Sequence, residues 1–375
     1  MLLLLLTNRL TFCRFLAVFL PEKDIFSQII SIENLYESWA EFKYGKRKKG
    51  DVQAFERKLE DNLFSLRYDL KNRTYRHSDY TSFYITDPKL RHIHKAEVRD
   101  RIAHHAIYRI LYTIFDKGFI YDSYSCRLEK GTHKAVARLK NFTQKVSKNN
   151  TIPCYALKCD VKKFFDSVDH EILLSLIKRK IADPDTLLLL EEIIESFSKP
   201  TKTAGVQLDL FDLHRANRER ERERELQPSA ASGKGIPIGN LTSQLFANIY
   251  MNELDQFVKH KLKIKYYLRY CDDFIILGNQ EEELHKIVER IGEFLFNNLK
   301  LSLHPNKVSI RKLNQGVDFL GYIVLPYYTV LRTKTRKRML KKVNKKNLFS
   351  YLGLLKHCDG YEQSRLILDK VKQCE

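Results

Sequence analysis

A pair of adjacent aspartates, Asp272 and Asp273, is the sequence feature that most constrains how this chain can fold. Apolar and aromatic residues at 266–270 precede the pair and those at 274–277 follow it, which is typical of two short strands joined as a β-hairpin. Because an unpaired charge is costly inside a sheet, both acids are expected at the turn. Two interpretations are open: a solvated hairpin turn, or two acids that a bound cation neutralises.

A third acid, Asp160, ends a second buried-type strand at residues 155–161. Two helices are expected after it, and Asp169 is placed to cap the first of them. The order strand, Asp160, helix, helix, strand, Asp272 is found in split β-α-β sheets, where neighbouring strand ends meet although they are far apart in sequence. The sequence therefore predicts that the three carboxylates converge at one edge of a sheet.

Three carboxylates that converge cannot all stay ionised without cations, and oxygen ligands of this kind suit Mg²⁺. The backbone carbonyl of Val161 is a candidate for one more ligand. Two such ions would activate an attacking hydroxyl and stabilise a leaving pyrophosphate. Lys89, Arg91 and Lys307 are expected to supply positive charge to a triphosphate. Phe165 is expected against the sugar of the incoming nucleotide, with core packing as the alternative.

The positive charge of the chain points to a polyanionic partner. The 375 residues carry a formal net charge of +20. Such an excess favours nucleic acid first and an anionic membrane surface second, whereas a basic protein without such a partner is the alternative. The densest basic run, within residues 332–347, is expected either to bind nucleic-acid phosphates or to form a solvated helix face.

Cysteine usage and the N-terminus bear on location. Seven cysteines without a C-x-x-C pair argue against a disulfide framework or a zinc ribbon, so a cytoplasmic protein is expected. Residues 1–20 are apolar but contain Arg9 and Arg14. A signal peptide would carry its charge before the apolar core, and a spanning helix would bury Arg14 in the bilayer. We therefore expect no membrane partner, and interpret residues 1–24 as an uncertain N-terminal extension.

Periodicity and turn signals predict the remaining elements. These are helices over 25–72, a hairpin over 82–93, a helix that opens after Gly233 and runs to about Leu262, and strand pairs over 301–310 and 317–324. Residues 199–234, with strict Arg-Glu alternation at 218–225, are predicted to be a surface insertion or linker. His104 and His105 are either packing residues or ligands.

Five motifs in this order resemble those of reverse transcriptases. They are Asp160-Val-Lys-Lys-Phe-Phe165, the pair Gly239 and Ser243, Tyr270-Cys-Asp-Asp273, Lys307, and Phe319-Leu-Gly321. The resemblance implies an α+β right-hand polymerase, with fingers, a palm of antiparallel sheet and helices, and a short helical thumb. It implies that Asp160, Asp272 and Asp273 are catalytic, that Phe319, Leu320 and Gly321 form a primer grip, and that template RNA, dNTPs and cDNA are the partners. The expected domains are 25–150 for the N-terminal helices and fingers, 151–330 for the palm and 331–375 for the thumb.

The stretch Ile238-Gly-Asn-Leu-Thr-Ser-Gln244 resembles one subgroup of that family, the enzymes of diversity-generating retroelements. Most reverse transcriptases carry Gln in place of Ile238 and Pro in place of Gln244. The resemblance places Ile238, Gly239 and Gln244 at the nucleotide, and it implies error-prone copying opposite adenine and a basic oligomeric accessory protein. An aliphatic side chain at position 238 also removes a hydrogen-bonding group near the incoming nucleotide.

Two further kinds of function stay open. One is a reverse transcriptase of the retron, group II intron-like or phage-defence type. The lack of an evident maturase-like extension after the expected thumb counts against the intron form. The other is an RNA-binding scaffold without catalysis, against which the three intact acids count, since a pure binder gains nothing from carboxylates that face phosphates.

Overall fold

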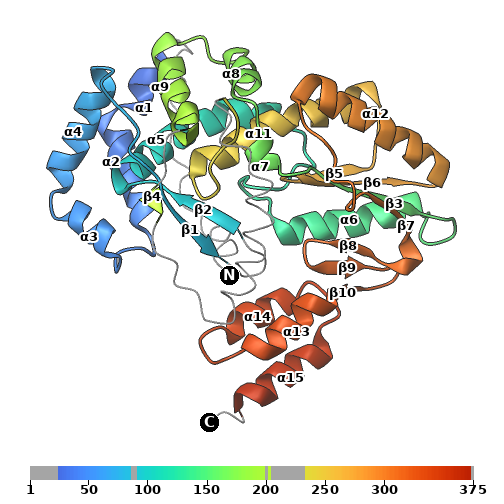
Figure 1. The fold of residues 1–375 in the computed structure, drawn as a ribbon. Helices are drawn as coiled ribbons and strands as arrows, with labels where there is room; N and C mark the ends of the chain where they lie inside the picture. Colours follow the sequence, from blue (N-terminus) through green and yellow to red (C-terminus); the bar gives the residue numbers. More distant parts are fainter. Residues whose placement is uncertain (1–23, 86–90, 199–201, 204–232, 373–375) are drawn as a thin grey trace. The chain divides into compact units, whose positions relative to one another are not determined.

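The computed structural model describes residues 24–85, 91–198, 202–203 and 233–372 (Figure 1). The residues before 24, Lys89 and the charged alternation at 218–225 lie outside the described residues. The chain divides into two compact units that alternate along it. Unit 1 is drawn from residues 1–119, 163–253 and 298–301, and unit 2 from residues 120–162, 254–297 and 302–375.

Unit 1 is mainly helical and carries one small sheet. Strands β1 and β2 form an antiparallel hairpin, and β4 adds to β1 in parallel. The hairpin expected over 82–93 is thus confirmed in its two strands. The elements are α1 (Ile25–Ile29), α2 (Ile32–Lys43), α3 (Gly50–Glu56), α4 (Leu59–Lys71), β1 (Thr81–Ile85), β2 (Arg91–Lys95), α5 (Val98–Phe115), α7 (Phe164–Ser167), α8 (His170–Lys178), α9 (Pro184–Glu195), β4 (Lys202–Thr203) and α11 (Leu241–Gln256), whose end belongs to unit 2.

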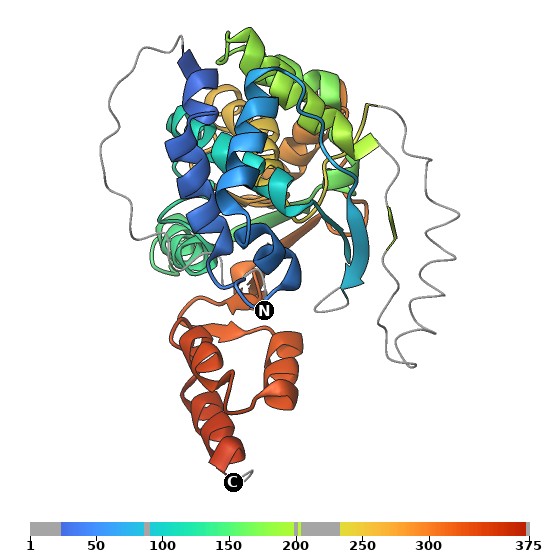
Figure 2. The same cartoon turned by 90° about the vertical axis from the view of Figure 1, so that its left-hand side faces the viewer.

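Helix α2 shows why this part of the chain folds as helices. The Ser31 side chain caps it by accepting a hydrogen bond from the Asn34 backbone N–H. Leu35, Trp39 and Phe42 then recur on one face and are buried. This face packs α2 against α4 and α5 (Figure 2). Asp169 likewise caps α8, as expected, by accepting from the backbone N–H of Ile172.

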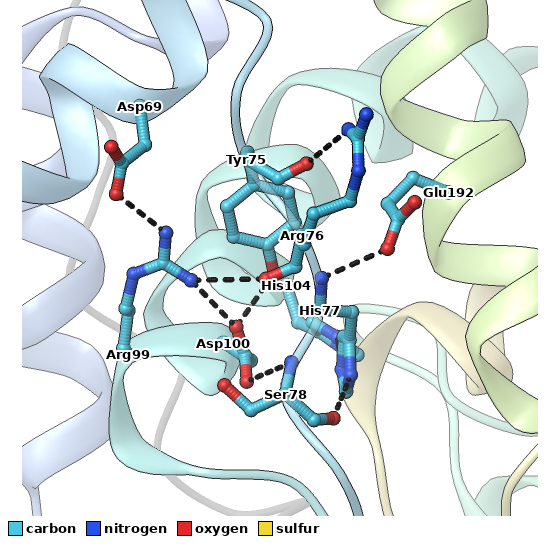
Figure 3. A network of polar contacts seen from close by, with 9 residues as sticks. All are labelled: Asp69, Tyr75, Arg76, His77, Ser78, Arg99, Asp100, His104 and Glu192. Atoms are coloured by element: carbon cyan, nitrogen blue, oxygen red, sulfur yellow. Dashed lines mark hydrogen bonds and ion pairs between the residues drawn. The ribbon is translucent and has the colours of Figure 1, made fainter. Parts of the chain in front are cut away.

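A buried polar network holds α5 to the segment before β1 (Figure 3). The Asp100 carboxylate has no exposed surface and accepts hydrogen bonds from the Tyr75 hydroxyl at 2.8 Å and the Ser78 backbone N–H at 3.1 Å. Arg99 contacts Asp100 at 3.3 Å and Asp69 at 2.8 Å. A buried carboxylate is costly unless it is paired in this way, so the network stabilises one packing of these segments.

His104 is a packing residue rather than a metal ligand. It is buried, its Nε2 lies 3.1 Å from Nε2 of His77, and its Nδ1 lies 2.9 Å from the Thr242 hydroxyl. Burial lowers the pKa of His104 well below its ordinary value, and the nearby His77 adds to this. The contact with Thr242 ties the first turn of α11 to α5.

Unit 2 contains a four-stranded antiparallel sheet in the order β5-β6-β3-β7 and a three-stranded meander, β8-β9-β10. Helices follow the meander at the C-terminal end (Figure 1). The elements are α6 (Thr132–Val146), β3 (Tyr155–Asp160), β5 (Tyr267–Tyr270), β6 (Asp273–Gly278), α12 (Glu281–Leu299), β7 (Ser309–Lys312), β8 (Val317–Phe319), β9 (Tyr322–Val324), β10 (Thr329–Leu331), α13 (Thr333–Lys342), α14 (Leu348–Leu355) and α15 (Tyr361–Lys372).

One apolar core joins the sheet, the meander and the C-terminal helices of unit 2. Leu268 and Ile275 contribute from the sheet, Phe319 from the meander, and Met339 and Ile367 from the helices. Since all of them are buried, these elements share one core rather than folding as separate bodies. No helix among the described residues is both long and apolar enough to cross a bilayer.

One local prediction was wrong. Residues 301–310 do not form a strand pair: only an isolated bridge between Val161 and Leu303 and the start of β7 are extended there. Pro305 in this stretch has no N–H to donate to a ladder. The helix predicted to run to about Leu262 is confirmed in its extent: it is α-helical to Gln256 and continues as one π-turn, Phe257–Lys261.

Candidate active site

The three predicted acids meet at one end of the unit 2 sheet. Asp160 is the last residue of β3, and the antiparallel register places it directly opposite Asp273, the first residue of β6. Tyr270 pairs with Asp273 across the hairpin, so Cys271 and Asp272 form a two-residue turn. The convergence expected from the strand order is therefore confirmed.

The turn itself is held in an uncommon conformation. Cys271 has φ of 58°, a left-handed value that a two-residue hairpin turn requires and that usually selects glycine. The Nη1 of Arg269 donates to the Cys271 carbonyl at 2.9 Å. Strain of this kind persists only where surrounding contacts hold it, and it places Asp272 at the tip.

Burial and mutual repulsion raise the pKa of two of these acids, Asp272 and Asp273. Burial raises the pKa of Asp273 to about 6; Lys158 opposes this, and the charges of Asp272 and Asp160 add to it. The pKa of Asp272 is also raised, by burial first and by Asp160 second, with Lys307 among the groups that oppose it. A cluster in which each carboxylate penalises the next attracts cations.

One cation of the chain already lies in the cluster. The ammonium of Lys307 is 2.8 Å from Oδ1 of Asp160. The segment that carries it runs beside the end of β3, because the His304 backbone N–H donates to the Asp160 carbonyl at 2.8 Å and that of Lys162 donates to Ser302 at 2.9 Å. Backbone hydrogen bonds of the segment that carries Lys307 therefore place this lysine beside the acids.

The carboxylate oxygens of these acids are chemically suitable ligands for magnesium, although the side chains are not arranged as a ready metal site. Among the described residues, no group of three or more His, Cys, Asp or Glu side chains has the arrangement of a ready metal site. The acids at this end of the sheet are all oxygen donors, as Mg²⁺ prefers, and two of them share a hydrogen bond that a divalent ion would replace.

Sequence reasoning missed a buried ion pair behind the turn. Arg269 and Asp255 have no exposed surface; Nε of Arg269 lies 2.7 Å from Oδ1 of Asp255 and Nη2 lies 2.6 Å from Oδ2. The Tyr267 hydroxyl donates to the same carboxylate at 2.6 Å. Burial lowers the pKa of the Arg269 guanidinium, and Asp255 more than offsets this, so the net pKa is raised. An arginine in the middle of an apolar strand was the available signal.

The nucleotide-motif residues lie in unit 1. The carbonyl of Ile238 accepts a hydrogen bond from the His94 backbone N–H of β2 at 3.1 Å. Gly239 has φ of 120°, and a Cβ there would lie 3.1 Å from the Ile93 side chain. Gln244 is partly exposed on the first turn of α11.

Two more of the expected nucleotide contacts are described in unit 1. Arg91 begins β2 and is partly exposed. Phe165 is also partly exposed, whereas the neighbouring Phe164 fills the core. The Phe165 ring lies edge-on to Phe164 with centroids 5.3 Å apart, so both the nucleotide contact and core packing stay open for it.

The expected primer grip is the β8–β9 hairpin of unit 2. Phe319 pairs with Tyr322, and the two turn residues Leu320 and Gly321 have φ of 50° and 90°. The Phe319 side chain is buried, so only the turn presents groups to a partner. The Gly321 carbonyl accepts from the Arg332 backbone N–H at 2.9 Å, which ties the hairpin to the start of α13.

Comparisons with known proteins found similar sequences and one similar structure. Residues 86–324 match the profile of a family described as "Reverse transcriptase (RNA-dependent DNA polymerase)". The chain is 26% identical to Protein YkfC of Escherichia coli (strain K12), with 62% of this chain and 63% of that protein covered. It is 25% identical to the Group II intron-encoded protein LtrA of Lactococcus lactis subsp. cremoris, with 79% of this chain and 54% of LtrA covered. A solved structure of apo telomerase from Candida tropicalis, truncated from its C-terminal domain, has a TM-score of 0.47 at 13% identity, covering 72% of this chain and 60% of that one. The chain thus spans less than two thirds of the length of the two curated relatives.

Proposed function

The chain belongs to the reverse transcriptase family, and on that premise we propose that it is an RNA-directed DNA polymerase that copies a template RNA into cDNA. The observation that carries the proposal is the meeting of Asp160, Asp272 and Asp273 at one end of the unit 2 sheet. The expected α+β right-hand polymerase fold is confirmed by the family match and by the mixture of helices with antiparallel sheet.

In this proposal the three aspartates hold two magnesium ions, with the Val161 carbonyl as a further ligand. Magnesium bound there would supply positive charge that activates the primer 3′-hydroxyl and balances the leaving pyrophosphate. The chain's own contribution is to hold the acids at the ends of paired strands. Lys307 would exchange its ion pair with Asp160 for the phosphates of the incoming nucleotide.

We assign the other predicted contacts to the same reaction. Lys89 and Arg91 would neutralise the triphosphate, and the partly exposed Phe165 would face the sugar. The tip of the β8–β9 hairpin would hold the primer. Helix α13, whose ten residues include six Lys or Arg, would bind the duplex phosphates, so nucleic-acid binding should weaken steeply with salt.

For the subtype, we propose the mutagenic enzyme of a diversity-generating retroelement, with error-prone copying opposite adenine and a basic oligomeric accessory partner. The support is the Ile238-to-Gln244 motif, whose aliphatic residue 238 is partly exposed on a loop paired to β2. A group II intron-like enzyme is the second candidate, favoured by the likeness to LtrA. We further propose a reducing, cytoplasmic location, in keeping with the five free cysteines among the described residues.

The test is incorporation of dNTPs on a primed RNA template by the full chain and by Asp272→Asn. We expect the variant to lose incorporation, because a neutral amide is a poor magnesium ligand, while RNA binding is retained. Asp369→Asn, on the exposed face of α15, is the matched control and should remain active. A parent chain that binds RNA but never incorporates dNTPs with magnesium would instead establish the non-catalytic scaffold.

A further inference from the structure

A pocket of about 370 Å³ opens in unit 2 between α6, the β9–β10 connection and the α14–α15 connection. Its lining includes Lys140 of α6, Tyr327 and Tyr328 of the β9–β10 connection, and Lys356 of the α14–α15 connection. The volume falls in the range of small-molecule sites and suits one nucleotide rather than a duplex. None of these residues belongs to the three-aspartate cluster or to the nucleotide motifs.

The two tyrosines are placed as a binding platform. Tyr327 is 77% exposed and Tyr328 is 49% exposed. Within the part of the chain that the structure describes, neither ring stacks on another ring or lies under a cation. Large exposed aromatic rings without a partner usually serve recognition, since their burial by a ligand is favourable. Bases of any sequence can stack on such rings.

Two residues that line the same pocket carry buried polar atoms without a partner among the described residues. Thr329 is 6% exposed, and its hydroxyl is one of these atoms; its carbonyl accepts a hydrogen bond from the Asp359 backbone N–H at 2.7 Å. The Nε2 of His133 is the other, and the His133 ring stacks on that of His357 with centroids 3.7 Å apart. A buried polar atom without a partner is costly, so a ligand that supplies hydrogen bonds would be stabilised here.

The charge of the pocket selects an anion. Lys140 and Lys356 outnumber the one lining carboxylate, Asp359. A second pocket, of about 330 Å³ in unit 1, has the opposite character, because its four carboxylates outnumber its two arginines. Of these two pockets among the described residues, the one in unit 2 combines exposed aromatic rings with a positive balance, which are the elements of single-strand recognition.

The pocket is separate from the expected primer grip. Strand β9 runs from Tyr322, next to the turn at Leu320 and Gly321, to Val324, which leads into the Tyr327–Tyr328 connection. The two turns thus lie at opposite ends of one strand. A nucleic-acid segment in the pocket would be held apart from the primer end.

From this combination we infer that the pocket binds one nucleotide of a single-stranded nucleic-acid segment, with its base on Tyr327 and Tyr328 and its phosphate at Lys140 and Lys356. The site is a second anchor for the RNA. The proposed site requires only nucleic-acid binding, so it can be tested separately from polymerase activity.

The test measures binding of a fluorescein-labelled single-stranded RNA pentamer to the full chain by anisotropy. Tyr327→Ala/Tyr328→Ala should weaken binding about tenfold or more, as expected for the loss of stacking. Tyr327→Phe/Tyr328→Phe should restore it, because the rings remain. Tyr361→Ala, which is 73% exposed and does not line the pocket, is the matched control and should bind as the parent does.

Charge gives an independent measurement. Lys140→Gln should reduce the dependence of log affinity on log salt by about 0.7, the value for one contact to a single strand. Unchanged affinity in the double alanine variant, with melting as in the parent, would overturn the inference. The inference would also be overturned if the double alanine variant lost self-association or binding to a protein partner while its RNA affinity stayed unchanged. Primer extension on a short preformed duplex should persist in the tyrosine variants, so failure of this site is distinguishable from failure of the polymerase proposal.

Discussion

Replacement of Asp255 by Asn tests the most deeply buried interaction near the acids. The change keeps the size of the side chain and removes the charge that faces Arg269. Both side chains have no exposed surface, so the guanidinium would be left charged without compensation. Breaking a buried pair in this way costs about 3–5 kcal/mol. The retained amide oxygen keeps one acceptor for Arg269 or Tyr267, so we expect the lower part of that range.

The measurement is the free energy of unfolding in urea, with Glu253→Gln as the matched control. Glu253 lies two residues before Asp255 and pairs with Arg179, but these side chains are 31% and 61% exposed. Exposed pairs contribute about 0–1 kcal/mol, so the control should be nearly neutral. If Asp255→Asn is no more destabilising than Glu253→Gln, the reasoning from burial is wrong.

A double variant separates the effect of the Arg269–Asp255 pair on stability from its effect on the position of the hairpin turn. Arg269→Met/Asp255→Leu replaces both charges by apolar groups of similar length, which is often neutral for stability. It also removes the donor to the Cys271 carbonyl at the hairpin turn. We therefore expect a folded protein with lower dNTP incorporation at saturating substrate. Full activity in this folded variant would show that the pair does not position the turn.

Three further predictions concern β2 and the loop that pairs with it. Ile238→Gln should lower misincorporation opposite adenine in sequenced products, because it restores a hydrogen-bonding group at the loop. Gly239→Ala should destabilise the fold by about 1–3 kcal/mol in urea, since φ is 120° and the new methyl would lie 3.1 Å from Ile93. Burial, with His92 adding to it, lowers the pKa of His94 to about 4. In the unfolded chain His94 takes up a proton near pH 6.5, whereas in the folded chain it stays neutral down to about pH 4. The free energy of unfolding is therefore unaffected by His94 above pH 6.5 and falls as the pH drops below it. Between pH 7 and pH 5 the parent should lose about 2 kcal/mol of stability through His94, and His94→Phe should not show this loss.

Each of these has a result that contradicts it. An unchanged error spectrum in Ile238→Gln would remove the argument from that side chain. Gly50→Ala is the control for Gly239→Ala, because nothing lies within 4 Å of its added methyl and its φ is ordinary; equal effects would refute the role of backbone strain. An acid dependence in His94→Phe equal to that of the parent would show that His94 carries no such penalty.

The element pattern near the acids could be predicted from local sequence. Strands at 155–161 and 274–277, the hairpin turn at Asp272 and the cap at Asp169 all follow from side-chain alternation, turn chemistry and capping, which act over a few residues. The same local reasoning failed at residues 301–310, where apolar residues around Pro305 were predicted to be strands but run as a turn beside β3.

What only the tertiary structure decided is which distant groups meet. The residues alone predicted that Asp160 and Asp272 approach, but the exact partner of Asp160 across the sheet, Asp273, depends on strand register. Arg269 in an apolar strand signalled a buried charge, but the local sequence did not identify its partner Asp255. Nor did it identify Asp160 as the partner of Lys307, because both pairings depend on how a helix end and a loop pack against the sheet. Local sequence determined where charge occurs along this chain; burial, which sets what each charge costs and which partner must neutralise it, was decided by the fold.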